Sequence, residues 1–221
     1  MNILIAPALG VIGLLAALLV FSLVSRLEEL TVSIGSDARI SSPELQEAVA
    51  NGISRAGFGV DVIGMVPIPV ANFCTWRASL GDKPYLAGVY ITASHNPAEY
   101  NGIRFRHPDG AGYTEGNIEI KRMFFEELAE DHSEVGKINM LSTEEELKTY
   151  TDFVKSKVGN LEGMRIAIDP GNGVGSVIID ELFQKFGVET FCINNEPDGS
   201  FPNRPSEPAP KNLSKLISIA E

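Results

Sequence analysis

The stretch AGVYITASHNPAEYNG, residues 87–102, joins an apolar run to a loop that carries a serine, a histidine and an asparagine in a row. The apolar, β-branched run predicts a strand over 87–92. Ligands of open α/β sheets bind beyond the carboxyl ends of the strands, so we expect Ser94 at such an edge. Asparagine-proline at 96–97 and asparagine-glycine at 101–102 predict two tight turns around its hydroxyl. The loop has no G-x-S-x-G pattern, which does not favour a serine hydrolase.

The same strand-and-helix pattern precedes this stretch. The predicted strands are 30–35 and 58–64, and the predicted helices are 42–56 and 69–80. Ser42 is the expected N-cap of the first helix, Pro43 suits its first turn, and Gly57 ends it. Such β-α-β units indicate three-layer α/β/α domains, each with a mainly parallel mixed sheet between helices.

Further along the chain, the pattern predicts a second domain. Helices are expected over 115–130 and over 143–158, where Thr143 and Glu146 form a capping box, and 131–142 reads as polar and irregular. A strand (164–168), a glycine-rich loop, a helix (177–186), a strand (188–194) and a final helix (212–221) follow. We therefore predict an apolar segment over 1–30, a first domain over 31–150 and a partial second domain over 163–221. Two strands are too few for a covered parallel sheet, so we expect self-association through this domain.

Charge and cysteine content narrow the classes of function. The chain has 18 basic and 29 acidic residues, a net charge of −11, which disfavours a general nucleic-acid binder. Its two cysteines, Cys74 and Cys192, have no metal-binding spacing. Two free thiols are typical of a reduced compartment, so we expect a cytoplasmic protein.

The N-terminal segment leaves three interpretations open. Residues 3–24 contain no charged side chain, and the first basic side chain, Arg26, follows the run. The length and the flanks favour a buried helix over a membrane anchor or signal. A mis-assigned start is the third interpretation, and the membrane anchor stays open.

Several strings together resemble one family. They are GSDARISSPEL (35–45), VIGMVPIP (62–69), TASHNP (92–97) followed by YNG, DPGNGVGS (169–176) and INNEPDGSFPNRPSEPAPKNL (193–213). In this order they resemble the α-D-phosphohexomutases, the phosphoglucomutase and phosphomannomutase family, over roughly residues 31–221. The threonine that opens TASHNP looks more like the glucose and mannose members than the glucosamine branch.

The resemblance implies a hexose phosphate mutase that moves a phosphoryl group between C1 and C6 through a hexose bisphosphate. Ser94 would carry the phosphoryl group beside Mg²⁺, with hexose 1,6-bisphosphate as activator and a hexose phosphate as substrate. The implied residues are Ser94, His95 and Arg104 in catalysis, and Thr92, Asn96, Asn101 and Arg39 in the substrate and phosphate loop. Arg104, Arg106 and His107 form a local basic cluster, for which a solvated strand edge is the alternative.

The chain departs from the family pattern at three points. It has no Arg-Gly pair before the first strand, and Arg104 replaces the usual lysine after YNG. It also has no DGDxDR-like loop for the metal and no sugar-binding or phosphate-binding loop of later domains. The ligands of Mg²⁺ other than phosphorylated Ser94 are therefore expected to be absent. The alternative to an enzyme is a non-catalytic mutase fragment that binds a phosphosugar or a partner.

Overall fold

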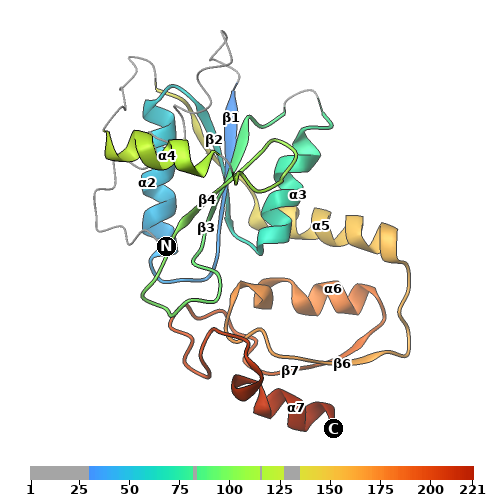
Figure 1. The fold of residues 1–221 in the computed structure, drawn as a ribbon. Coiled ribbons are helices and arrows are strands. Elements are labelled where there is room, and N and C mark those ends of the chain that lie inside the picture. Colours follow the sequence, from blue (N-terminus) through green and yellow to red (C-terminus); the bar gives the residue numbers. More distant parts are fainter. Residues whose placement is uncertain (1–29, 82–83, 115, 127–134) are drawn as a thin grey trace.

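The computed structural model describes residues 30–81, 84–114, 116–126 and 135–221 and consists of a larger and a smaller α/β unit (Figure 1). The larger unit contains a five-stranded sheet in the order β4-β3-β1-β2-β5, and the smaller contains the strand pair β6-β7. The strands are β1 (Thr31–Ser36), β2 (Gly59–Met65), β3 (Ala87–Ile91), β4 (Ile103–Arg106), β5 (Ile138–Met140), β6 (Arg165–Ile168) and β7 (Glu189–Cys192). The helices are α2 (Ser42–Arg55), α3 (Ile68–Ala78), α4 (Asn117–Phe125), α5 (Thr143–Val158), α6 (Ile179–Lys185) and α7 (Ser214–Ala220), with short 3-10 helices at Val174–Val177 and Pro210–Asn212.

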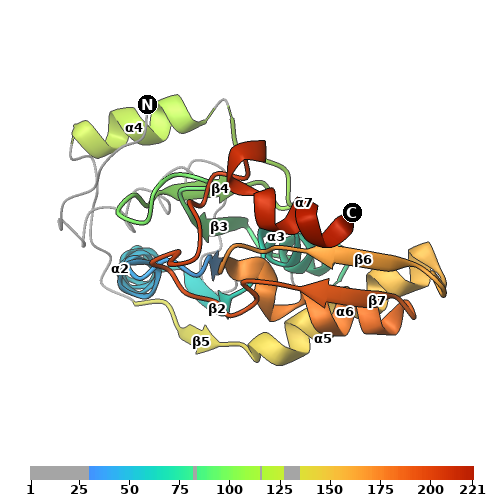
Figure 2. The same ribbon diagram turned by 90° about the horizontal axis from the view of Figure 1, so that it is seen from below.

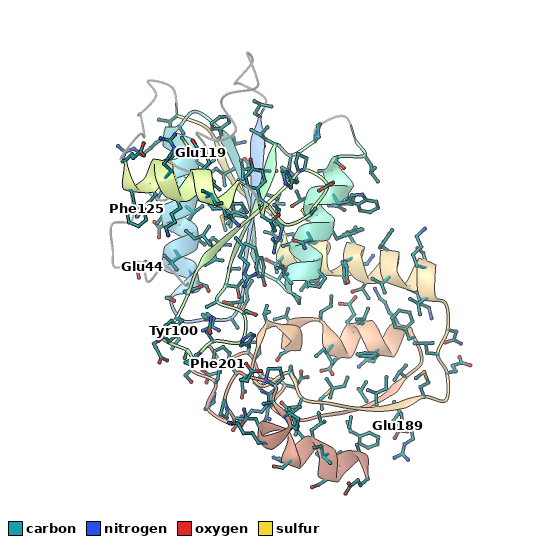
Figure 3. The ribbon with its side chains drawn as sticks, viewed as in Figure 1. Glu44, Tyr100, Glu119, Phe125, Glu189 and Phe201 are labelled. Atoms are coloured by element: carbon teal, nitrogen blue, oxygen red, sulfur yellow. The ribbon has the colours of Figure 1, made fainter. Side chains whose placement is uncertain are left out.

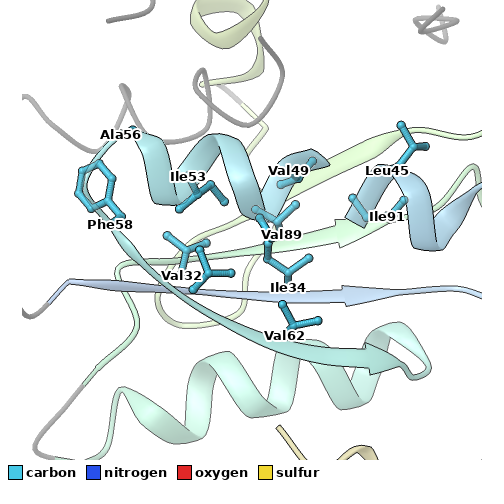
Figure 4. Packing of buried hydrophobic residues seen from close by; sticks show 12 residues of the cluster. Val32, Ile34, Leu45, Val49, Ile53, Ala56, Phe58, Val62, Val89 and Ile91 are labelled. Atoms are coloured by element: carbon cyan, nitrogen blue, oxygen red, sulfur yellow. The ribbon is translucent and has the colours of Figure 1, made fainter. Parts of the chain in front are cut away.

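Strand β1 lies at the centre of the large sheet, parallel to both β2 and β3. Its side chains alternate between the two faces, as the strand period requires. Val32 and Ile34 pack with apolar residues of α2 on one face (Figure 4). On the other face, the Ser33 hydroxyl lies 2.8 Å from the Thr75 hydroxyl of α3. The two helices therefore cover opposite faces, and burial of each large apolar side chain contributes about 1.5–3 kcal/mol.

The serine loop, defined here as residues 92–102, reverses the chain between β3 and β4. Strand β4 runs antiparallel to β3, with Arg104 opposite Tyr90 and Ile103 opposite Ile91. The loop therefore lies at the carboxyl end of β3, and the arginine that follows it stays close to its base.

Helix α5 connects the two units. Its Phe153 ring packs on Phe73 of α3, with ring centroids 4.7 Å apart. On the smaller unit, the Lys185 ammonium of α6 lies 2.8 Å from the Asp152 carboxylate of α5. Strands β6 and β7 lie beneath the larger unit in Figure 1, and the view from below in Figure 2 shows α5 and α6 running alongside them. The connecting helix thus fixes the smaller unit against the carboxyl edge of the larger sheet.

Most predicted elements are confirmed, and so is the three-layer α/β class with mostly parallel sheets. Three details were wrong. Ser42 does not cap α2: its hydroxyl donates to Asp37, 2.8 Å away, and Ser41 precedes the helix. Ser142 rather than Thr143 caps α5, accepting a bond from the Glu145 amide. Residues 138–140, expected to be irregular, form β5, because they pair with the edge of β2.

Other predictions lie outside the described residues or stay untested. The apolar segment up to residue 29 and the stretch 127–134 fall outside the described ranges. Within those ranges, no helix has the length and apolarity needed to cross a membrane. Cys74 and Cys192 are both free thiols. The domain boundaries stay a prediction.

Candidate active site

The carboxyl ends of the two sheets face each other across a cavity. Loops after β1 and β3 reach it from the larger unit, and loops after β6 and β7 reach it from the smaller one. The cavity has a volume of about 490 Å³. It is lined from the larger unit by Asp37, Ala38, Pro67, Ile68, Pro69, Tyr90, Thr92, Ser94, His95 and Arg104, and from the smaller by Pro170, Gly171, Gly173, Val174, Gly175, Phe201, Ser206 and Pro208. This is where ligands bind in open α/β sheets, and Ser94 lies in its wall.

Ser94 has a left-handed backbone with φ +60°, a conformation that few residues other than glycine adopt. Such a backbone costs about 1–2 kcal/mol and persists only where neighbouring groups hold it. The Ser94 amide donates to the Thr92 hydroxyl, 2.9 Å away, and its carbonyl accepts a bond from Arg39, also at 2.9 Å. The side chain is exposed. The loop therefore presents the Ser94 hydroxyl to the cavity while its backbone is bound from below.

Arg39 lies under the serine loop and is only 1% exposed. Its Nη1 donates to the carbonyls of Pro97 (2.6 Å) and Tyr100 (2.9 Å). Its Nη2 donates to the carbonyls of Ser94 (2.9 Å) and Asn96 (2.7 Å), and its Nε donates to Asp37 (3.2 Å). A guanidinium has five N–H groups, and all five are used here. Arg39 holds the loop in shape and has no donor left for a phosphate.

Asp37 connects the loop after β1 to the serine loop. Its Oδ2 accepts a bond of 2.6 Å from the Thr92 hydroxyl, and its Oδ1 accepts one of 2.8 Å from the Ser42 hydroxyl. Because Thr92 in turn accepts the Ser94 amide, a continuous chain of bonds runs from Asp37 to Ser94. Burial, reinforced by the Asp37 charge, raises the pKa of Tyr90 far above its ordinary value. The phenol of Tyr90, which lines the cavity and donates to the Val66 carbonyl at 2.7 Å, therefore stays neutral.

Asn101 and Asn96 stabilise the ends of the serine loop. The Asn101 amide donates to the hydroxyls of Ser41 (2.9 Å) and Ser42 (3.1 Å), and its Oδ1 accepts a bond from the Gly102 amide. The Asn96 side chain donates to the Ala93 carbonyl, 2.9 Å away. Both asparagines therefore brace the turns that the sequence predicts.

His95 lies beside the Ser94 hydroxyl, and the cation of Arg104 lines the same cavity. His95 Nδ1 lies 3.3 Å from Ser94 Oγ, and its Nε2 lies 3.3 Å from a carboxylate oxygen of Glu207. Arg104 lines the cavity, and its side chain has no ion pair or hydrogen bond among the described residues. The other members of the basic cluster are engaged elsewhere: Arg106 donates to Asn72, and the His107 ring packs on Tyr113. Only Arg104 of the three therefore offers a free cation to the cavity.

The clamp loop, defined here as residues 196–208, reaches the serine loop from the smaller unit. The Ser206 hydroxyl lies 2.7 Å from the carbonyl oxygens of both His95 and Asn96. The Phe201 ring lies 5.2 Å from the guanidinium carbon of Arg39, which also donates to the Tyr100 carbonyl; Figure 3 labels both Phe201 and Tyr100. The sequence alone did not assign a function to this loop.

The clamp loop is itself anchored to the loop after β6. Arg204 donates to the Asp169 carboxylate (2.7 Å) and to its carbonyl (3.0 Å), and the Asp169 side chain is 2% exposed. Burial by itself would raise the pKa of Asp169, but hydrogen bonds from Asn194, Arg204 and the Gly171 amide lower it below the ordinary value. The two loops of the smaller unit thus form one connected body.

Comparison with known proteins matches two parts of the chain to two domains of one family. Residues 13–131 match the family described as phosphoglucomutase/phosphomannomutase, alpha/beta/alpha domain I, and residues 147–221 match domain II of the same family. The chain belongs to the phosphoglucomutase/phosphomannomutase family. The structure resembles that of a phosphoglucomutase/phosphomannomutase family protein from Burkholderia thailandensis, with a TM-score of 0.84 and 28% identity over 98% of this chain and 46% of the other.

Curated relatives of this family carry two kinds of name. A probable phosphoglucosamine mutase of Methanobrevibacter smithii is 36% identical over 85% of this chain and 41% of its own length. A phosphoglucomutase/phosphomannomutase of Thermococcus kodakarensis is 31% identical over 86% of this chain and 41% of its own length. The chain thus spans about two fifths of these relatives, and the threonine of TASHNP does not decide between the two names.

The structure brings together all the residues that the sequence singled out for the site. Ser94, His95 and Arg104 line the cavity, whereas Arg39 and Asn101 bind the loop from beneath and Thr92 does both. Sequence reasoning missed Asp37, Phe201, Ser206 and Glu207 as neighbours of Ser94. Their strings matched the family, but their contacts join loops that lie 55 to more than 100 positions apart, and such contacts leave no local signal.

Proposed function

We propose that the chain is the phosphoryl-carrying portion of a hexose phosphate mutase. Ser94 would accept a phosphoryl group from a hexose 1,6-bisphosphate and return it to a hexose phosphate. One observation carries this proposal: Ser94 is held in a left-handed backbone at a cavity that also contains the Arg104 cation, whose side chain has no partner among the described residues. Phosphoryl transfer depends mainly on positioning and on neutralisation of charge, and these residues provide both.

The transfer to Ser94 balances as a direct displacement. The bond between Ser94 Oγ and phosphorus forms while the bond between phosphorus and the sugar oxygen breaks. The hydroxyl proton of Ser94 passes to Nδ1 of His95, which lies 3.3 Å away, and the sugar oxygen takes a proton from solvent. Arg104 neutralises the charge of the phosphoryl oxygens, although it cannot act as a proton acceptor at neutral pH. The return transfer to the other hydroxyl of the sugar reverses these steps.

Mg²⁺ belongs to the proposal for a complete mutase, but the described residues do not fit a magnesium site by themselves. Both carboxylate oxygens of Asp37 are already occupied by Arg39, Ser42 and Thr92. The described part of the chain holds no group of three metal-binding side chains. For this reason the steps above use only residues of this chain.

The second candidate function is a phosphosugar-binding module without turnover. The lack of a metal-binding group within the described ranges favours it, because a bound metal is a large source of electrostatic stabilisation in such transfers. In that case the cavity and Arg104 would still bind a sugar phosphate, while Ser94 would stay unmodified.

Intact mass spectrometry after incubation with glucose 1,6-bisphosphate and Mg²⁺ separates the two candidates. We expect a gain of one phosphate in the wild-type chain and none in Ser94→Ala. A folded chain that binds glucose 6-phosphate in calorimetry but gains no phosphate would refute the transfer and support the binding module. As a matched control, Ser200→Ala removes a serine hydroxyl whose hydrogen bond within the described residues goes to Asp198, and this variant should gain phosphate normally.

A further inference from the structure

One hydroxyl of the smaller unit contacts the backbone of the serine loop at two points, next to the contact between Glu207 and the His95 ring. Ser206 Oγ lies 2.7 Å from the carbonyl oxygen of His95 and 2.7 Å from that of Asn96. A serine hydroxyl has one proton, and both partners are acceptors, so the two carbonyls share that proton. These residues are more than 100 positions apart, and the contact crosses from one unit to the other.

The carbonyl groups of the serine loop show why this contact matters. Arg39 binds four of them, on Ser94, Asn96, Pro97 and Tyr100, and bypasses that of His95. Among the described residues, the His95 carbonyl has Ser206 as its hydrogen-bond partner. Among the consecutive carbonyls of residues 94–97, Ser206 therefore supplies a donor to the one that Arg39 does not bind. The carbonyl concerned immediately follows the left-handed Ser94 residue.

The clamp loop is rigid enough to hold Ser206 in place. Pro205 precedes the serine, and Arg204, one position earlier, is tied to Asp169 by two hydrogen bonds. The Asn203 amide donates to the buried Asn172 side chain at 3.0 Å. The hydroxyl is therefore presented by a fixed backbone, which is the requirement for a group that positions another.

We propose that Ser206 is a positioning residue through which the second domain holds Ser94 in its transfer geometry. It would act on the backbone of the serine loop without touching the phosphoryl group. Its catalytic consequence rests on the proposed function, since it presumes that Ser94 accepts phosphate. Its structural consequence, that the serine loop is ordered across the junction by this hydroxyl, stands independently.

Hydrogen exchange measured by mass spectrometry on the full chain tests the structural consequence. In Ser206→Ala we expect exchange in the peptide 92–101 to rise about tenfold, the effect of losing one hydrogen bond, with β1 unchanged. Ser206→Thr keeps the hydroxyl and should restore the wild-type rate. Ser200→Ala, in the same loop, should leave the peptide unchanged. Unchanged exchange in Ser206→Ala, or an equal rise in Ser200→Ala or throughout β1, would overturn the proposal.

The rate at which the same variants gain a phosphoryl group from glucose 1,6-bisphosphate tests the catalytic consequence. Ser206→Ala should lower the maximal rate by about ten- to a hundredfold, the range that follows from a misplaced nucleophile, at an unchanged half-saturating bisphosphate concentration. A higher half-saturating bisphosphate concentration with an unchanged maximal rate would contradict a positioning role for Ser206. If the wild-type chain gains no phosphate at all, the proposed function fails, and the exchange experiment still decides whether Ser206 orders the loop.

Discussion

Replacement of Arg39 by methionine is the strongest test of how the site is built. The side chain is 1% exposed, and all five of its N–H groups are used on the Asp37 carboxylate and four carbonyls of the serine loop. Methionine has a similar length and no donor. The variant would therefore leave a buried carboxylate without its cation and remove a donor from each of the four carbonyls, of which those of Asn96 and Pro97 keep a second donor in Ser206 and the Tyr100 amide.

The size of the effect follows from these contacts. Removing one partner of a buried ion pair costs about 3–5 kcal/mol, so we expect Arg39→Met to lower the free energy of unfolding by ~4 kcal/mol. That is a large part of the roughly 5–15 kcal/mol typical of a domain. Arg39→Lys keeps the charge but has only three donors on one nitrogen, so it should recover only part of the loss.

Urea denaturation followed by circular dichroism measures this effect as a shift of the midpoint at constant slope. Arg122→Met is the control, because its ion pairs with Glu119 and Glu126 are exposed and its midpoint should not change. In the double variant with Asp37→Asn, the loss should be smaller than the sum of the single losses, because no unpaired carboxylate remains. A loss below ~1 kcal/mol for Arg39→Met, with an unchanged slope, would refute the reasoning.

Three further predictions concern the second domain and the thiols. The depressed pKa of Asp169 contributes stability that is complete above the unfolded value of about 3.9 and is lost as pH falls through the folded value. The urea concentration at the unfolding midpoint should therefore decrease when the pH is lowered below 4, and this decrease should be smaller in Asp169→Asn. Equal decreases in the two proteins would contradict this prediction. Burial raises the pKa of the Cys74 thiol to about 12, so at pH 8 Ellman's reagent should react with the half-buried Cys192 first and with Cys74 only on unfolding. Gly171 has φ +61°, and a Cβ at this position would overlap the Arg204 guanidinium. Gly171→Ala should therefore lower the temperature of the unfolding midpoint. An unchanged midpoint would show that the loop can adjust.

The sequence could predict the elements whose own side chains specify them. The alternating apolar run of β1 and the periodic apolar positions of α2 both produce the buried core seen here. Strand β5 was missed because its three residues have no pattern of their own and form a strand only by pairing with β2. The helix caps were misplaced by one residue because the Ser42 and Thr143 hydroxyls bind groups outside their helices: Asp37 in the preceding loop and the Ile63 carbonyl of β2.

The candidate site, too, could be predicted from the sequence only in part. The string TASHNP and the arginine after it could be recognised locally, and the structure places them around one cavity. The burial of Arg39 could not be read from the sequence, because its five acceptors come from two loops that meet only in the folded chain. The contacts of Ser206 and Glu207 depend on how the second domain sits against the first, which no local pattern encodes.

The central claim is that Ser94 carries a phosphoryl group in both directions, and single-turnover transfer tests it most directly. The chain would be phosphorylated with glucose 1,6-bisphosphate, freed of the reagent and mixed with glucose 6-phosphate or glucosamine 6-phosphate, with intact mass and ³¹P NMR followed over time. The account predicts that the phosphate leaves the protein as a newly formed sugar bisphosphate, faster with one of the two sugars, and that Ser94→Ala never acquires it. A phosphate that stays on the protein, or appears only as inorganic phosphate, would contradict the account.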